Sequence, residues 1–252
     1  MDKKLEKLKV LREAGRRVCE KIIKSRQDIV AVYILGSVAR GNIHENSDID
    51  LCVIVNRGEK AWREIIQEMS CNVDIAYAPL RLWIERLQRE MGSMWEINVS
   101  SILDSIILYD PTGLIRKIKR ELSVYPEEKR IENILHQFNV MGWYENAVRY
   151  HYLKGNYDYE AIFSKFFAFE ALKLLFPLNR TYLKGEKYLF EQVKELKAPP
   201  GYVEECFYLL WFKSHNIEKE EATYIIGKVS EIRKKAVKTL RQTGIELPKL
   251  VP

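Results

Sequence analysis

Short apolar runs rich in β-branched residues mark the first half of the chain. One run covers residues 29–35 and ends at Gly36, and another covers residues 72–78. Between them, apolar residues alternate with other residues at Ile49, Leu51, Val53 and Val55. Because successive side chains of a strand point to opposite faces, these runs predict three strands. A final strand of the same sheet is predicted within residues 102–109.

The same half of the chain also carries apolar residues at helical spacing. Over residues 3–25 they recur on one face, which predicts an amphipathic helix that leads into the first strand. The spacing recurs over residues 59–69, at Trp62, Ile65, Ile66 and Met69. Helices are therefore predicted at residues 3–25, 59–69 and 79–91, with a short helix after the turn at Gly36.

From Leu114 onward the pattern is almost wholly helical. Helices are predicted over residues 114–122, 127–154, 158–176, 185–196, 200–213 and 218–242. The breaks fall at Tyr125-Pro126, Gly155-Asn156, Pro177 and Pro199-Pro200-Gly201. Short connections between long amphipathic helices indicate an antiparallel bundle. The predicted class is α+β, with a small mixed sheet and flanking helices in a domain of residues 1–112 and an all-α bundle in residues 113–252.

Composition and charge exclude several classes of protein. Of the 252 residues, 47% are apolar and 30% are charged, as in folded globular proteins. No apolar run approaches the roughly 18 residues of a membrane span and the N-terminus lacks a signal-peptide core, so we expect a cytoplasmic protein without a membrane partner. The four cysteines and four histidines are scattered, which predicts neither a zinc site nor a disulfide framework. The net charge of +6 suits a partner rich in phosphate, either a nucleoside triphosphate or RNA.

Two closely spaced aspartates are the main chemical feature of the chain. Asp48 and Asp50 lie two residues apart in the second predicted strand, so their side chains share one face. Two carboxylates side by side repel each other, and a divalent cation removes that repulsion. Oxygen ligands of this kind suit Mg²⁺. If the run at residues 72–78 pairs beside this strand, Asp74 adds a third carboxylate, and three carboxylates can hold two metal ions roughly 3.5–4 Å apart.

A glycine–serine turn precedes the aspartates. Leu35-Gly36-Ser37 ends the first predicted strand, and ten residues separate it from Asp48. The backbone N–H groups of such a turn and the hydroxyl of Ser37 can face the phosphates of a nucleotide. Arg40 can add charge-assisted hydrogen bonds to the same phosphates. The turn and the aspartates together predict a site for chemistry at phosphorus.

This combination resembles the nucleotidyltransferase superfamily whose members share the polymerase-β-type palm. The family pattern is a hydrophobic residue, Gly, Gly or Ser, nine to thirteen residues, then Asp, a hydrophobic residue, Asp or Glu and a hydrophobic residue. Leu35-Gly36-Ser37 and Asp48-Ile49-Asp50-Leu51 match it, and Asp74 fits the third acidic position on a later strand. Ser47 opens a Ser-Asp-Ile-Asp-Leu form that resembles the minimal nucleotidyltransferases and the antibiotic-modifying adenylyltransferases. The clear match covers about residues 29–78.

The resemblance implies transfer of a nucleoside monophosphate, AMP from ATP in the first place, to a hydroxyl or similar group, with release of pyrophosphate. It implies two Mg²⁺ ions, or Mn²⁺ in their place, held by the catalytic residues Asp48, Asp50 and Asp74. The implied nucleotide contacts in the same segment are Gly36, Ser37, Arg40 and Ser47. Residues 179–187 resemble a loop that precedes a lysine-bearing helix in the C-terminal domains of some family members, which makes Lys187 a further predicted nucleotide contact.

The acceptor stays open at this point. A small molecule is the first expectation, and a protein or RNA is the alternative. Some minimal nucleotidyltransferases act as the antitoxin partner of a helical ribonuclease toxin, so an interaction protein is a second hypothesis. The Arg-x₄–₆-His motif of such toxins does not fit Arg149-Tyr150-His151, which is too closely spaced. A third hypothesis is an enzyme acting on RNA through the basic segments at residues 3–24 and 228–241, for which strong salt dependence of RNA binding is the test.

Overall fold

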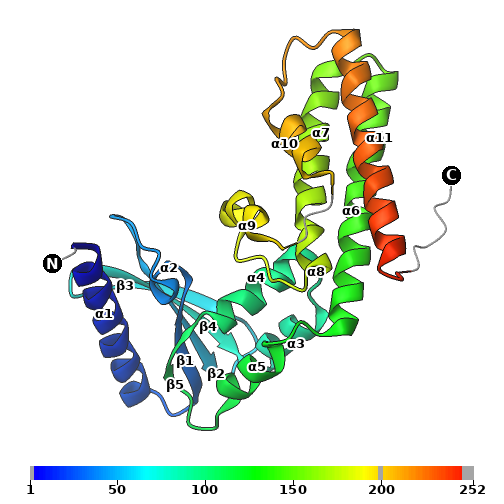
Figure 1. Ribbon diagram of the computed structural model, residues 1–252. Helices are drawn as coiled ribbons and strands as arrows, with labels where there is room; N and C mark the ends of the chain where they lie inside the picture. The colour runs from blue at the N-terminus through cyan, green and yellow to red at the C-terminus, as the bar shows by residue number, and fades with distance from the viewer. Residues whose placement is uncertain (1–2, 198–200, 246–252) are drawn as a thin grey trace. The chain divides into compact units, whose positions relative to one another are not determined.

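The chain folds into two compact units that share one helix. Figure 1 shows the structure, a computed structural model in which residues 3–197 and 201–245 are described. The first unit contains Met1–Glu90 and Asn98–Val124, and the second contains Met91–Ile97 and Tyr125–Pro252. The division thus falls after Val124, whereas the predicted domains meet between residues 112 and 113. The later position follows from α5 (Leu114–Leu122), whose Ile115 is buried in a core of the first unit.

A five-stranded mixed sheet forms the centre of the first unit (Figure 1). Its order is β3-β4-β2-β1-β5. The strands are β1 (Ile29–Leu35), β2 (Ile49–Val55), β3 (Trp62–Glu68), β4 (Cys71–Pro79) and β5 (Ile106–Tyr109). β2 and β4 are parallel and the other neighbours are antiparallel. The predicted α+β class with a small mixed sheet is therefore confirmed.

Helices cover the two faces of this sheet. On one face, α1 (Lys3–Ser25) contributes Leu11 and Val18 to a core with Ile49, Leu51 and other strand residues. On the other face, a smaller core joins α3 (Leu80–Arg89), α5 and the end of α4 (Gly92–Leu103) to Tyr33, Cys52 and Ile54. Because Cys52 and Ile54 alternate with Leu51 and Val53, the period of two along β2 separates the two cores.

The helix predicted over residues 59–69 is wrong, because this segment contains the edge strand β3. The strand pairs antiparallel with β4, and Trp62 stacks on Tyr77 with ring centroids 4.6 Å apart. Met69 and Ser70 connect the two strands with φ of 51° and 60°, the left-handed conformation that closes a two-residue hairpin. Neither residue is a usual signal for that turn, and the spacing of Trp62, Ile65, Ile66 and Met69 imitates a helical face.

The strand predicted within residues 102–109 is right only in its second half. β5 begins at Ile106, whereas Ile102 and Leu103 end α4. The pattern of the sequence predicts no element over most of α4. The predicted strands at β1, β2 and β4 and the predicted helices at α1 and α3 agree with the structure, and α2 (Gly36–Arg40) is the short helix expected after the turn.

The second unit is a helical bundle, as predicted. Its described elements are α6 (Glu127–Leu153), α7 (Tyr157–Lys173), α8 (Leu175–Leu178), the 3₁₀ helix η1 (Glu186–Tyr188), α9 (Leu189–Glu195), α10 (Val203–Trp211) and α11 (Lys219–Gln242). Figure 1 shows α6, α7 and α11 side by side, and their buried faces form one core around Phe138, Phe167 and Val229. Pro177 lies inside α8, not in the predicted break between helices. The predicted break at residues 199–201 includes Pro199 and Pro200, which lie outside the described residues.

None of the helices formed by residues 3–197 and 201–245 combines the length and the apolar character that crossing a bilayer requires.

Candidate active site

The sheet aligns two of the three predicted carboxylates in adjacent strands. Asp50 lies in β2 and is the register partner of Asp74 in the parallel strand β4. Neighbouring strands are about 4.8 Å apart, so the two side chains leave the same face of the sheet side by side. Asp48 directly precedes β2 and, two residues before Asp50, belongs to the same face. Asp74 was predicted to be the third carboxylate here if its strand pairs beside β2, and β4 does so.

The backbone at Gly36 approaches the Asp50 carboxylate closely. β1 ends at Leu35, the register partner of Asp50, and the chain turns into α2 at Gly36 with φ of +71°. A Cβ atom built on Gly36 would lie 2.3 Å from the Asp50 Oδ2 atom. Only glycine therefore allows this turn and this carboxylate to occupy their present positions. Ser37 follows in the first turn of α2.

A short loop brings Asp48 to the beginning of β2. The backbone N–H of His44 donates to the Ser47 hydroxyl at 2.8 Å, and the N–H of Ser47 donates to the carbonyl of His44 at 3.2 Å. Ser47 is 8% exposed. Its hydroxyl thus helps to close the loop before Asp48, and its predicted contact with a nucleotide stays a prediction.

Three residues outside the predicted site contact the predicted site residues. The Nε atom of Arg63 in β3 donates to Asp74 Oδ1 at 2.8 Å, and the side-chain amide of Asn72 donates to Asp48 Oδ1 at 3.1 Å. Arg40, predicted to contact phosphate, has its Nη1 3.6 Å from Asp104 Oδ2. Arg63 was missed because its segment was assigned to a helix, which would have separated it from Asp74. The spacing along the chain gave no signal for Asn72 or Asp104.

The donor chemistry of the site fits a hard divalent cation, although no complete metal cage is assembled. Asp50 and Asp74 present carboxylate oxygens from neighbouring strands, and such oxygens suit Mg²⁺ or Mn²⁺. Within residues 3–197 and 201–245, no three side chains of His, Cys, Asp or Glu are gathered in a way that could hold a metal ion. The contacts of Asp74 with Arg63 and of Asp48 with Asn72 hold these carboxylates in other interactions.

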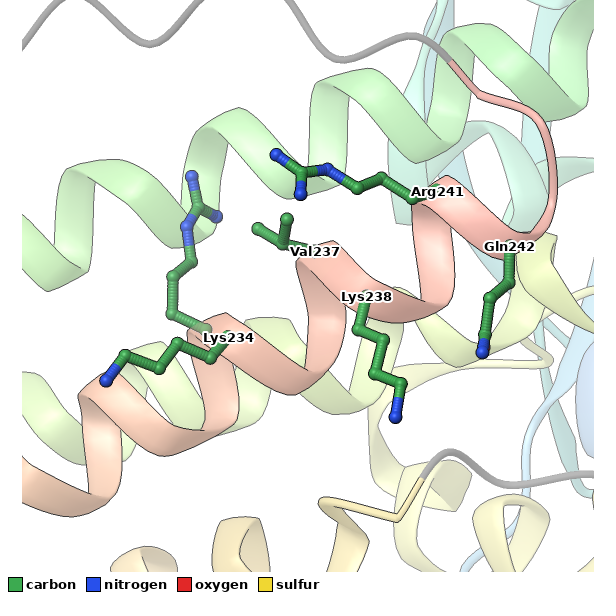
Figure 2. Close-up of a pocket in the computed structure, with 6 residues that line it drawn as sticks. Lys234, Val237, Lys238, Arg241 and Gln242 are labelled. Atoms are coloured by element: carbon green, nitrogen blue, oxygen red, sulfur yellow. The ribbon is translucent and has the colours of Figure 1, made fainter.

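The second unit carries the remaining predicted contact and a basic groove. Lys187 lies in η1, with its Nζ atom 5.1 Å from the centroid of the Tyr188 ring. The groove, with a volume of about 500 Å³, follows α11 and is lined by Arg233, Lys234, Val237, Lys238, Arg241 and Gln242. Figure 2 shows Lys238 and Gln242 pointing the same way from the helix, whereas Arg241 points elsewhere. None of these residues belongs to the unit that contains the aspartates.

Comparisons with known proteins identify the family and the fold. A family model described as a nucleotidyltransferase domain matches residues 16–150, which is more than half of the chain and includes all three aspartates. No curated protein matches the chain.

Among solved structures, a crystal structure of a nucleotidyltransferase-like protein from Exiguobacterium sibiricum 255-15 is similar to this chain with a TM-score of 0.62. The likeness covers 92% of this chain and 78% of that one at 12% sequence identity. At this identity, the likeness concerns the fold alone.

Proposed function

The chain belongs to the nucleotidyltransferase family, and from this premise we propose that it transfers a nucleoside monophosphate to the hydroxyl of an acceptor. In the first place the donor is ATP, the transferred group is AMP and the leaving group is pyrophosphate. The observation that carries the proposal is the register of Asp50 and Asp74 beside the turn at Gly36. The carboxylates and a turn that can face phosphates lie together where β1 ends and β2 begins. Phosphoryl transfer depends on such groups, which position the phosphates and stabilise their charge.

The proposed roles follow from these positions. Asp48, Asp50 and Asp74 would hold two Mg²⁺ or Mn²⁺ ions, which when bound stabilise negative charge on the reacting phosphate. For this role the ion pair between Asp74 and Arg63 must break so that Asp74 can bind a metal ion. The Arg63 side chain is 67% exposed and can therefore move into solvent. The N–H groups at Gly36 and Ser37 would bind the outer phosphates. Arg40 would neutralise charge on pyrophosphate after turning from Asp104.

The experiment is label transfer from each α-labelled nucleoside triphosphate with Mg²⁺, alone and with pooled small molecules, proteins and RNA. Asp50→Asn keeps the size of the side chain and removes its charge. We expect it to lower transfer by about 10²-fold or more, because a preorganised electrostatic interaction at the reacting phosphate is lost. Glu220→Gln, at an exposed acid in the first turn of α11, is the matched control and should leave transfer unchanged.

Retained transfer in Asp50→Asn would refute the role of this carboxylate. Absence of both transfer and Mg²⁺-dependent nucleotide binding in the unchanged protein would refute the proposed activity. Label found on RNA or on a protein would identify the class of the acceptor.

A further inference from the structure

A cavity of about 540 Å³ lies in the first unit, on the face of the sheet that carries the aspartates. We call it the sheet cavity and define it by Tyr33, Cys52, Arg63, Ala76, Trp83 and Arg86, which are among its lining residues. The strands supply the first four of these residues, and α3 supplies the other two. Its volume is in the range of sites for small molecules.

The register of the strands fixes the distance between this cavity and the carboxylates. Tyr33, Cys52, Ala76 and Arg63 form one row of register partners across the sheet. The row with Asp50 and Asp74 lies two residues away along β2 and β4. Two residues of a strand span about 7 Å, so a compact molecule in the sheet cavity can extend a hydroxyl group to the carboxylates. Leu35, the register partner of Asp50, also lines the cavity.

The lining favours a planar, mostly apolar occupant. Trp83 closes the cavity from α3, and its Nε1–H donates to the Tyr33 hydroxyl at 3.1 Å, which fixes both rings. Cys52 is buried and, with Ala76, contributes small side chains to the floor of the cavity. Rigid aromatic walls and a neutral floor suit an aromatic ring better than a flexible polar chain.

The charges at the cavity select against a cation. Arg63 and Arg86 are among the described residues that line it, and no carboxylate is. Each guanidinium group pairs with a carboxylate outside the lining, Arg63 with Asp74 at 2.8 Å and Arg86 with Glu90 at 2.5 Å. The two arginine side chains are 67% and 57% exposed, so both guanidinium groups belong to the open side of the cavity. Exposed ion pairs of this kind are weak, so an anionic acceptor can replace Asp74 and Glu90 as the partner of these guanidinium groups, whereas a polycationic acceptor cannot.

Arg63 connects the cavity to the catalytic carboxylates. It lines the cavity and at the same time donates to Asp74 Oδ1 at 2.8 Å. An anionic group in the cavity offers Arg63 a second partner for charge-assisted hydrogen bonds. Binding of such a molecule would thereby draw Arg63 away from Asp74 at the moment when Asp74 is needed for the reaction.

We propose, resting on the proposed nucleotidyl transfer, that the acceptor is a small aromatic hydroxy acid bound in the sheet cavity. Its carboxylate pairs with Arg63 and Arg86, and its hydroxyl lies toward Asp74. The hydroxyl oxygen forms a bond to the α-phosphorus of the nucleoside triphosphate while the bond from that phosphorus to the bridging oxygen breaks. Pyrophosphate leaves with the electron pair of the broken bond, and the hydroxyl proton passes to the Asp74 carboxylate.

The test uses 4-hydroxybenzoate as the probe, with kanamycin as a polycationic comparator and an RNA oligonucleotide as a macromolecular one. Binding of each is measured by calorimetry without nucleotide, and transfer is measured with α-labelled ATP. We expect 4-hydroxybenzoate to bind and to accept the label, and the two comparators to do neither. Ala76→Phe fills the cavity and should weaken binding of the probe by about tenfold or more, whereas Ala76→Ser, which keeps the space, should bind as the unchanged protein does.

If Ala76→Phe fails to fold, Arg86→Gln keeps the test valid. The Arg86 side chain is exposed, so this substitution should leave the fold intact. Loss of one exposed ion pair should weaken binding of the probe by about three- to fivefold and leave binding of ATP unchanged. Absence of binding by 4-hydroxybenzoate, or equal binding by Ala76→Phe and Ala76→Ser, overturns the inference.

Transfer to kanamycin or RNA that is insensitive to both substitutions overturns it as well, while the proposed transferase activity stands. Conversely, binding of the probe that responds to the substitutions, without any transfer or nucleotide binding, supports the cavity as an acid-binding site and refutes the transferase activity.

Discussion

The turn at Gly36 allows the sharpest test of how the fold positions the reacting groups. In Gly36→Ala, the added Cβ atom would lie 2.3 Å from Asp50 Oδ2. Ordinary van der Waals contact requires roughly 1 Å more, so either the carboxylate or the turn must move by about that distance. A displacement of 1 Å at a reacting group can lower a rate by about 10²-fold. The φ of +71° adds about 1–2 kcal/mol of backbone strain for an L-residue.

The two effects are separated by a matched control. Gly155 has φ of +70°, and an added Cβ atom there would have nothing within 4 Å. Gly155→Ala therefore introduces similar backbone strain without a collision. We expect both variants to lose about 1–2 kcal/mol in the free energy of unfolding, measured with urea, and only Gly36→Ala to lose about 10²-fold in kcat/KM for label transfer.

Two results would refute this reasoning. Transfer by Gly36→Ala within about twofold of the unchanged protein would mean that the contact of the turn with Asp50 does not position the reaction. An equal loss of transfer in both variants would mean that strain or instability, and not the position of the carboxylate, lowers the rate.

Two further predictions concern ionisable side chains. Arg63→Gln removes the partner of Asp74 and should strengthen binding of Mn²⁺ by up to about fivefold in calorimetry, since an exposed ion pair contributes at most about 1 kcal/mol; unchanged or weaker binding would contradict the role of Arg63. Burial raises the pKa of Glu160 to about 8, from an ordinary value of 4.5, and neither carboxylate oxygen has a hydrogen-bond partner among the described residues. Between pH 4.5 and 8, Glu160 has therefore lost its proton in the unfolded chain but keeps it in the folded protein. For this reason the free energy of unfolding should fall as the pH rises from about 4.5 to about 8. Glu160→Gln should reduce that fall by at least about 1 kcal/mol in urea unfolding at several pH values, and equal pH profiles would count against it.

The local pattern of the sequence was sufficient for most elements. Strands β1, β2 and β4 follow from apolar alternation, which depends only on the two faces of a strand. The long helices of the second unit follow from spacing and from proline and glycine breaks. The edge strand β3 could not be recognised in this way, because an edge strand has no strongly buried face and its apolar residues happened to match a helical period. Only pairing with β4 makes it a strand.

For the candidate site, too, local sequence and tertiary structure supply different information. The sequence by itself determined which groups are candidates for the site: a glycine–serine turn, two aspartates at the beginning of a strand and a third aspartate in a later apolar run. Adjacent positions in the chain are sufficient for this, because the period of a strand fixes the face of Asp48 and Asp50.

Only the tertiary structure decided how these groups meet. The parallel pairing of β2 and β4 places Asp74 beside Asp50, and the turn at Gly36 comes so close to that carboxylate that a Cβ atom cannot fit. The antiparallel pairing of β3 with β4 brings Arg63 to Asp74, and Arg63 also lines the sheet cavity. These contacts join segments that are distant in the sequence, and their energies depend on distance and burial, which no local pattern contains.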